Sequence, residues 1–170
     1  MLSSSFFIPY NTYDMQIIKP NSEIQETKFS ISIFLAGSIE MGVAEDWQSL
    51  LEKKLSEHEV TIFNPRRDDW DSSWKQDQSD PQFNHQVNWE MNHLQKANII
   101  FMYFSPETKS PISLLELGAY GDKGKMIVCC PKEFWRSGNV DIFCTRHNIP
   151  LFRTLDDAIG GLFTKISSAI

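Results

Sequence analysis

The sequence predicts an α/β fold, a three-layer sandwich with about five mainly parallel strands. Short apolar runs alternate with longer segments in which apolar residues recur at helical spacing, an order typical of strand–helix–strand units. The most continuous apolar run, residues 97–104, is typical of a central strand that is covered on both faces. The chain has 170 residues, of which 41% are hydrophobic, enough for one well-packed core.

The expected strands and helices follow from these runs in chain order. We expect strands at 30–36, 60–63, 97–104 and 126–130, a short strand around 140–143 and an edge strand at 150–152. We expect helices at 43–58 and 82–96, a helix that begins at Pro111, and a terminal helix at 156–170. The rest of 131–149 is expected to be irregular.

The first 28 residues carry no clear periodicity and contain two prolines among polar residues. We therefore divide the chain into an N-terminal extension, residues 1–28, and a single domain, residues 29–170. The extension is expected to lie outside the core, either partly disordered or packed across a neighbouring subunit.

Composition excludes several classes of protein. A net charge of -6 gives no basic surface for nucleic acid, and no stretch approaches the roughly 20 apolar residues of a membrane span. The N-terminus lacks the basic region of a signal peptide, and three cysteines without framework spacing indicate a reducing compartment, so we expect a cytoplasmic protein. The four histidines show no ligand spacing, so we expect neither a metal nor another cofactor.

Ligands of such folds bind where the carboxyl ends of the strands meet. The turn at 37–42 follows the first expected strand, and it either presents backbone N–H groups to a ligand or simply links strand to helix. The polar loop at 64–81 is long enough to be functional, with two tryptophans for stacking and Asp69, Arg66 and Arg67 for polar contacts. Its alternative is a surface loop held by tryptophans and internal ion pairs.

The stretch from Ser110 to Tyr120 predicts a helix with one carboxylate among apolar residues. Ser110 suits the N-cap and Pro111 the first helical position. The helical register brings Ile112, Glu116, Ala119 and Tyr120 to one side. A buried ionised carboxylate is costly unless a partner or a reaction uses it, so Glu116 is a candidate nucleophile.

Glu90 is a second carboxylate that interrupts an apolar helical stripe. If Glu90 and Glu116 converge in one pocket, one of them can attack carbon while the other donates a proton or holds hydroxyls. The alternative is that each carboxylate pairs with an arginine or caps a buried backbone group. The residues alone leave both readings open.

Four segments together resemble the nucleoside 2-deoxyribosyltransferase superfamily, in particular its deoxyribosyltransferase-like branch. They are Phe-Leu-Ala-Gly-Ser (34–38), Phe-Asn-Pro-Arg-Arg (63–67), Gln-Val-Asn-Trp-Glu (86–90) and Ser-Pro-Ile-Ser-Leu-Leu-Glu-Leu-Gly (110–118). The resemblance covers roughly residues 31–140. It implies a flavodoxin-like fold, cleavage of an N-glycosidic bond, a small-molecule nucleoside or nucleotide as partner, and a homo-oligomer.

The resemblance also implies roles for single residues. Glu116 falls on the nucleophile that attacks C1′ of a deoxyribose, and Glu90 falls on an acidic position that orients groups or helps to protonate the base. The expected substrate-binding residues are Gly37 and Ser38 beside the sugar, Asp69 and Trp70 beside the base, and Ser110, which stands where transferases carry an aspartate.

Two alternatives to a transferase of nucleosides stay open. A related branch hydrolyses deoxynucleotides and carries a basic residue where this chain has Glu40, so phosphate would be repelled there, although Arg66 and Arg67 provide positive charge. The replacement of the aspartate by Ser110 suits a nucleotide-binding module without catalytic activity.

Overall fold

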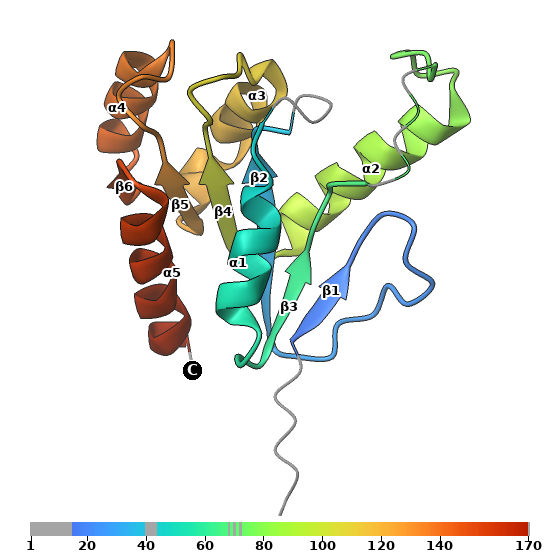
Figure 1. Cartoon of the computed structure of the whole chain (residues 1–170), viewed down its shortest axis with the longest axis horizontal. Helices are drawn as coiled ribbons and strands as arrows, with labels where there is room; N and C mark the ends of the chain where they lie inside the picture. Colours follow the sequence, from blue (N-terminus) through green and yellow to red (C-terminus); the bar gives the residue numbers. More distant parts are fainter. Residues whose placement is uncertain (1–14, 40–43, 68, 70, 72, 170) are drawn as a thin grey trace, which may run out of the picture.

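The computed structural model describes residues 15–39, 44–67, 69, 71 and 73–169. Its centre is a six-stranded sheet of order β1-β3-β2-β4-β5-β6 in which every pairing is parallel (Figure 1). The strands are β1 (Gln16–Ile18), β2 (Ile31–Gly37), β3 (Val60–Phe63), β4 (Ile99–Tyr103), β5 (Met126–Cys129) and β6 (Leu151–Phe152). The fold class is the expected one, a flavodoxin-like α/β sandwich, with six strands instead of about five.

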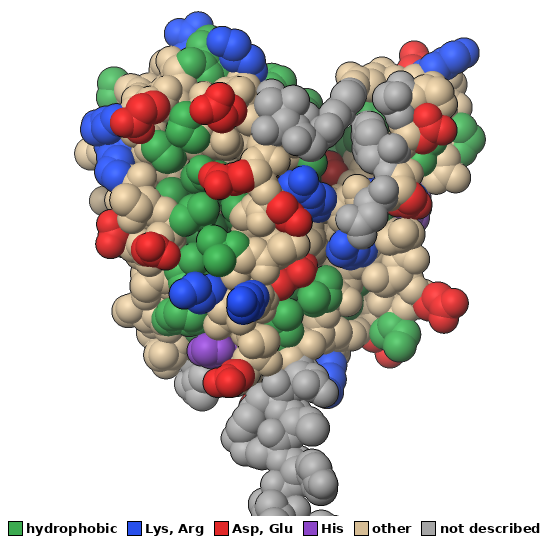
Figure 2. Space-filling model, in the orientation of Figure 1, with side chains coloured by type: hydrophobic (Ala, Val, Ile, Leu, Met, Phe, Trp, Pro, Cys, Tyr) green, Lys and Arg blue, Asp and Glu red, His purple; other side chains and the backbone are tan. Residues whose placement is uncertain are grey.

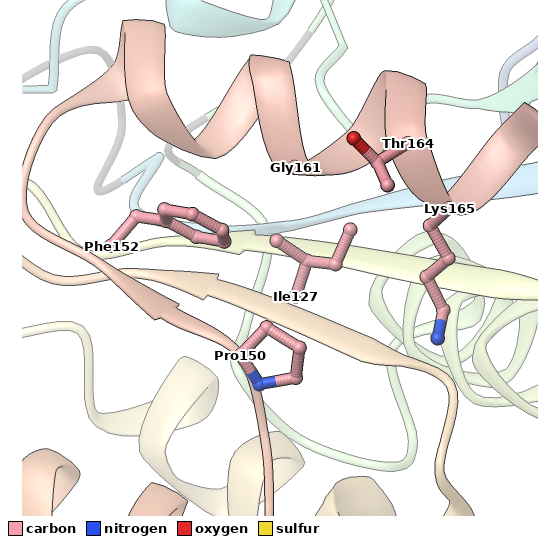
Figure 3. A pocket seen from close by; sticks show the side chains of 6 residues that line it. All are labelled: Ile127, Pro150, Phe152, Gly161, Thr164 and Lys165. Carbon is pink, nitrogen blue, oxygen red and sulfur yellow. The ribbon is translucent and has the colours of Figure 1, made fainter.

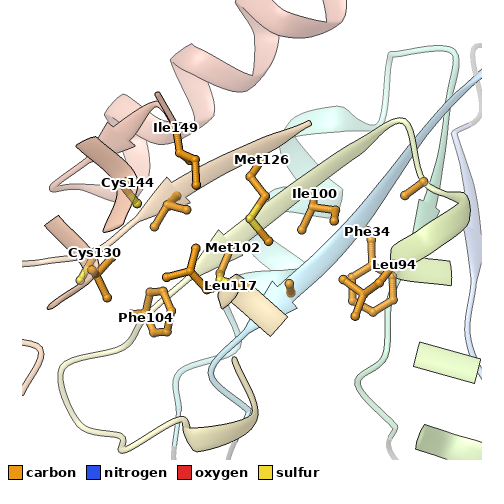
Figure 4. Close-up of a cluster of buried hydrophobic side chains, with 14 of the residues drawn as sticks. Phe34, Leu94, Ile100, Met102, Phe104, Leu117, Met126, Cys130, Cys144 and Ile149 are labelled. Atoms are coloured by element: carbon orange, nitrogen blue, oxygen red, sulfur yellow. The ribbon is translucent and has the colours of Figure 1, made fainter. Parts of the chain in front are cut away.

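Helices cover both faces of the sheet (Figure 1). They are α1 (Trp47–Leu55), α2 (Pro81–Lys96), α3 (Pro111–Tyr120), the short 3₁₀ turn η2 (Gly121–Lys123), α4 (Ser137–Arg146) and α5 (Leu155–Ala169). One core lies between the sheet and α1 with α5, and it contains Trp47, Leu51 and Leu162. The other lies between the sheet and α2, α3 and α4 (Figure 4). None of the helices in the described residues is long and apolar enough to cross a bilayer.

The order of the strands creates a switch point between β2 and β4. The chain leaves β2 for β3 on one side and then returns across β2 to form β4 on the other side. Ligands of doubly wound sheets bind where the order reverses, outside the carboxyl ends of the strands. Here those ends are Gly37 of β2 and Tyr103 of β4.

The expected short strand at 140–143 is wrong, because these residues belong to α4. The buried residues of that helix are Val140 and Cys144, four positions apart, which is a helical and not a strand period. The four residues Val-Asp-Ile-Phe (140–143) are too few to distinguish a strand period from a helical one, so the sequence alone did not separate them. The first helix is also shorter than expected, since α1 begins at Trp47 after its N-cap, Asp46.

Part of the predicted N-terminal extension joins the sheet. Gln16–Ile18 pairs with β3 as an edge strand, and the side chain of Ile18 is fully buried. For these three residues the expectation of a position outside the core is wrong. Downstream, the Gln25 amide oxygen accepts a hydrogen bond from the indole of Trp89 at 2.8 Å. The division of the chain at residue 28 stays a prediction.

Candidate active site

The ends of β2 and β4 approach each other closely at the switch point. Gly37 has φ +129°, and a Cβ there would overlap the carbonyl of Tyr103. The next residue, Ser38, donates its backbone N–H to the same carbonyl at 2.9 Å. Glycine is therefore required at position 37 by the backbone geometry. Its expected place beside a sugar stays a prediction.

Three buried hydroxyls link the loops that follow β2 and β4; we call Ser38, Thr108 and Ser110 the hydroxyl cluster. The Ser38 oxygen lies 2.8 Å from that of Thr108 and 2.6 Å from that of Ser110, and the last two are 2.7 Å apart. The backbone N–H of Ser105 donates to the Ser38 hydroxyl at 2.8 Å. All three residues are at most 3% exposed, so these hydroxyls bind one another and hold the two loops together.

Ser110 occupies the predicted N-cap of α3 but does not cap the helix with its side chain. Its hydroxyl belongs to the hydroxyl cluster, and its backbone adopts the left-handed conformation, with φ 45°. Non-glycine residues in that conformation carry strain that the surrounding contacts must hold in place. Pro111 takes the first helical position, as predicted.

The buried side of α3 differs from the expected one. Ser113 and Leu117 are buried, whereas Ile112 is 60% exposed and Ala119 is exposed as well. Leucine at 117, and not isoleucine at 112, packs into the core beside α2 and α4. Glu116 is half-buried at the margin of this buried side.

The structure brings Glu90 of α2 and Glu116 of α3 together. The two helices meet where the Tyr120 hydroxyl donates to the carbonyl of Met91 at 3.3 Å. Glu90 directly precedes Met91, Glu116 lies one helical turn before Tyr120, and the charge on Glu90 is close enough to raise the pKa of Glu116. Towards its N-terminal end α2 runs away from α3 (Figure 1), and the upper outline of the molecule is hollowed (Figure 2).

Both carboxyl groups hold their protons more tightly than ordinary glutamates. Burial, followed by repulsion from the charge on Glu90, raises the pKa of Glu116 to about 8. Burial raises the pKa of Glu90 to about 7 against the opposing effect of a hydrogen bond from Gln86. Between about pH 7 and pH 8 the pair thus holds about one proton, since two close carboxylates resist ionising together. Glu116 lies beyond the first turn of α3, where the helix N-terminus stabilises a negative charge only weakly.

Gln86, one turn before Glu90, is a site residue to which sequence reasoning assigned no role. Its side-chain amide donates to a Glu90 oxygen at 2.7 Å and to the carbonyl of Pro65 at 3.0 Å. The residue is only 4% exposed. Its spacing of four from Glu90 was the available signal, because residues at i and i+4 of a helix are neighbours.

The loop after β3 uses its charged side chains internally. Asp69 is exposed and accepts two hydrogen bonds from Arg67, at 2.8 and 2.7 Å. The Arg67 guanidinium lies 4.9 Å from the centre of the Trp74 ring. Arg66 reaches instead towards α1, 3.3 Å from Gln48 and 3.8 Å from Asp46. Trp70, the other residue expected beside the base, lies outside the described residues.

Other features of the described chain do not coincide with the carboxylate pair. No group of three or more His, Cys, Asp or Glu side chains in this part of the chain is arranged to hold a metal ion. A pocket of about 460 Å³ lies between β5, β6 and α5 (Figure 3), and its lining contains none of the predicted site residues. That lining consists of Ile127, Pro150, Phe152, Gly161, Thr164 and Lys165.

An α/β protein of flavodoxin-like fold with two neighbouring carboxyl groups, on α2 and α3, has groups that can serve acid–base or nucleophilic chemistry. Residues 30–134 match the family model described as nucleoside 2-deoxyribosyltransferase like, and the chain belongs to that family. The match runs from the start of β2 past the end of β5 and includes Glu90 and Glu116. The predicted resemblance is thereby confirmed. No curated protein matches the chain.

Proposed function

We propose that the protein cleaves or transfers at the N-glycosidic bond of a nucleoside through a covalent glycosyl-enzyme on Glu116. The observation that carries the proposal is the half-buried pair of Glu90 and Glu116, which repel each other within the part of the chain that matches the family. Family membership supports a general role in nucleoside glycosyl transfer. The carboxylate pair supplies the groups that such chemistry needs.

In the first half-reaction, the proton shared by the pair resides on Glu90 while the Glu116 carboxylate attacks C1′ of the sugar. A bond forms between the Glu116 oxygen and C1′, and the bond between C1′ and the base nitrogen breaks. The electron pair of that bond stays on the base. The base takes the proton from Glu90 either at the nitrogen that was bonded to C1′ or at another atom of its ring. The oxocarbenium-like transition state is stabilised by the nearby negative charge.

In the second half-reaction, Glu90 is ionised and acts as the base. Water or the N–H of a second base loses its proton to Glu90 and attacks C1′, and the ester bond to Glu116 breaks. The pair again holds one proton, so the cycle closes. Water as acceptor makes the protein a hydrolase, and a base as acceptor makes it a transferase.

The predicted substrate-binding residues take part in this proposal in two ways. Gly37, Ser38 and Ser110 lie at the end of β2 and in the loops that follow β2 and β4. The buried hydroxyls of Ser38 and Ser110 would fix the backbone beside the sugar rather than bind the sugar directly. Asp69 and Trp70 belong to the loop proposed to contact the base.

The test is incubation with a panel of deoxynucleosides and their 5′-monophosphates, with and without a free acceptor base, followed by chromatography. We expect base release or base exchange by the natural protein and a loss of at least about 10³-fold in Glu116→Gln, since removal of a nucleophile has effects of that order or larger. The exposed Glu133 provides the matched control, Glu133→Gln, which should retain the activity. Full activity in Glu116→Gln would overturn the proposal.

The same panel separates the alternatives. Turnover restricted to the 5′-monophosphates without an acceptor base would identify a nucleotide N-glycoside hydrolase, with Arg66 or Arg67 as candidates for the phosphate. Binding without turnover of any compound would identify an inactive nucleotide-binding module.

We further propose that the chain forms a homo-oligomer. The outward side of α3 is apolar along its length: its exposed residues are Pro111, Ile112, Leu115, Gly118 and Ala119. A helix that is apolar both towards the core and on its outward surface is typical of a position buried on both sides. The molar mass in solution tests this assembly, and the cytoplasmic location stays a prediction.

A further inference from the structure

The side chain of Gln86, on helix α2, is buried and makes two hydrogen bonds. Its amide nitrogen has two hydrogens, and both are used, one by the Glu90 carboxyl at 2.7 Å and one by the carbonyl of Pro65 at 3.0 Å. Its amide oxygen is buried and has no hydrogen-bond partner among the described residues. An unsatisfied buried acceptor is rare and calls for a physical explanation.

The orientation of this amide is fixed by Pro65. A carbonyl oxygen only accepts hydrogen bonds, so the NH₂ end of Gln86 must face it, and rotating the amide by 180° would place two oxygens against each other. The same NH₂ end therefore always faces Glu90. A donor at that distance favours the ionised form of the carboxyl over the protonated form.

We propose that Gln86 is the positioning residue that decides which member of the pair holds the shared proton, with the charge on Glu90 and the proton on Glu116 in the free enzyme. The inference rests on the proposed function, because it assigns the resting state of the same pair. Gln86 also ties Glu90 to Pro65, the second residue of the loop proposed to contact the base. The first half-reaction then begins with the transfer of that proton from Glu116 to Glu90.

Charged groups on the neighbouring elements have other partners. After β3, Arg66 lies beside Asp46 and Arg67 pairs with Asp69. Before α3, the Lys109 ammonium lies 4.6 Å from the Trp135 ring.

On the helices themselves, the neighbouring titratable groups are His93 of α2 and Tyr120 of α3. A ring nitrogen of His93 lies 2.8 Å from the carbonyl of Trp89, and the Tyr120 hydroxyl donates to Met91. The burial of His93 lowers the pKa of its ring, which keeps the ring neutral at the pH where the pair titrates. Among the described residues, Gln86 is thus the group whose hydrogen bond distinguishes the surroundings of Glu90 from those of Glu116.

The test is a titration of the carboxyl carbons by ¹³C NMR in protein labelled at glutamate, with the two signals assigned through Glu90→Gln and Glu116→Gln. In the natural protein we expect Glu90 to ionise before Glu116. In Gln86→Met, which keeps the length of the side chain and removes the donor, we expect the midpoint of Glu90 to rise and that of Glu116 to fall. The expected change is roughly one to two pH units, the usual effect of a hydrogen bond to a charged group.

Gln48→Met is the matched control, because Gln48 is a fully buried glutamine of α1 whose amide nitrogen also has no hydrogen-bond partner in the described part of the chain. It should leave both glutamate midpoints in place. If Gln86→Met does not fold, Gln86→Asn retains the amide on a side chain too short to bridge both acceptors, and the same opposite shifts are expected. Unchanged midpoints, or two midpoints that move in the same direction, overturn the proposal.

The titration does not depend on turnover, so the two proposals fail separately. Opposite shifts in a protein that processes no nucleoside would sustain the assignment of Gln86 and reject the catalytic function. With an active protein, the pH dependence of kcat/KM should move with the glutamate midpoints in Gln86→Met and stay in place in Gln48→Met. If the protein is active but the pH dependence of kcat/KM does not move in Gln86→Met, the role of Gln86 is rejected and the proposed function is not.

Discussion

The hydroxyl cluster and the carboxylate pair are two polar groups of side chains near the same edge of the sheet, and they are built in opposite ways. Every hydroxyl of Ser38, Thr108 and Ser110 has partners within the cluster, and none carries a charge. The pair of Glu90 and Glu116 contains repelling groups beside an amide oxygen with no partner among the described residues. Satisfied polar networks rigidify a fold, whereas unsatisfied ones cost stability and persist where they serve a function.

The comparison also shows that buried polar residues have two different roles in this protein, one in holding loops together and one in binding protons. Ser38 was expected beside the sugar and Ser110 at the position where transferases carry an aspartate, yet both side chains are engaged in contacts between loops. Glu90 and Glu116 keep proton-binding sites that change occupancy near neutral pH. Substitutions in the first group should therefore act on folding, and those in the second on chemistry and on the pH dependence of stability.

The largest effect on stability is expected from Glu116→Gln at alkaline pH. An unfolded glutamate ionises near 4.5, whereas Glu116 does so at about 8 in the folded protein, so the native state retains a proton that the unfolded state loses. The contribution of Glu116 to stability therefore falls as pH rises from about 4.5 and levels off above about 8. Because glutamine cannot ionise, the variant should be more stable than the natural protein at pH 8, by on the order of 2–4 kcal/mol.

Urea unfolding of both proteins from pH 5 to pH 8.5 measures this difference. The comparison is needed because His93, with its lowered pKa, acts in the opposite sense below its ordinary value of 6.5 and contributes equally to both. If the difference in free energy of unfolding between the two proteins does not grow with pH, Glu116 ionises normally. The carboxylate pair would then not differ from the hydroxyl cluster in the way described.

A smaller loss of stability is expected when the hydroxyl cluster is broken by Ser38→Ala. The substitution removes the acceptor of the Ser105 N–H and one partner each of Thr108 and Ser110. Buried groups left without partners cost about 1–3 kcal/mol, and the loss should not depend on pH between 5 and 8. Thermal and urea unfolding measure it, with the exposed Ser167→Ala as control. Unchanged stability in Ser38→Ala would mean that the cluster does not hold the loops.

The fold could be predicted from sequence because most elements carry an unambiguous period. The runs at 60–63 and 97–104 match β3 and contain β4, and the helix expected at 82–96 is α2 without its first residue. The strand at Gln16–Ile18 has only three residues, and its formation depends on β3, some 40 positions away in the chain. Sequence reasoning on local patterns had no means to detect that pairing.

The identity of the two carboxylates could be predicted from the sequence, but their relative position and their protonation could not. Glu90 and Glu116 stood out because each interrupts an apolar stripe, yet their meeting depends on where α2 and α3 touch, at Met91 and Tyr120. The raised pKa of Glu116 could not be predicted from the sequence, because desolvation is a property of the packed structure. The role of Gln86 was missed because half of its contacts come from Pro65, on another loop.

The smallest effect on stability is expected from Asp69→Ala. This substitution tests whether the loop after β3 acts on folding, like the hydroxyl cluster, or on chemistry, like the carboxylate pair. The Asp69 side chain is 54% exposed, and its ion pair with Arg67 is of the kind that contributes less than about 1 kcal/mol to stability. If the loop contacts the base, KM should rise while kcat stays unchanged, since an interaction equal in ground and transition states is lost. Steady-state kinetics measures this, with Asp77→Asn, an exposed residue of the same loop, as control. A fall in kcat with unchanged KM would place Asp69 with the reacting carboxylates, and a stability loss as large as that of Ser38→Ala would place it with the hydroxyl cluster.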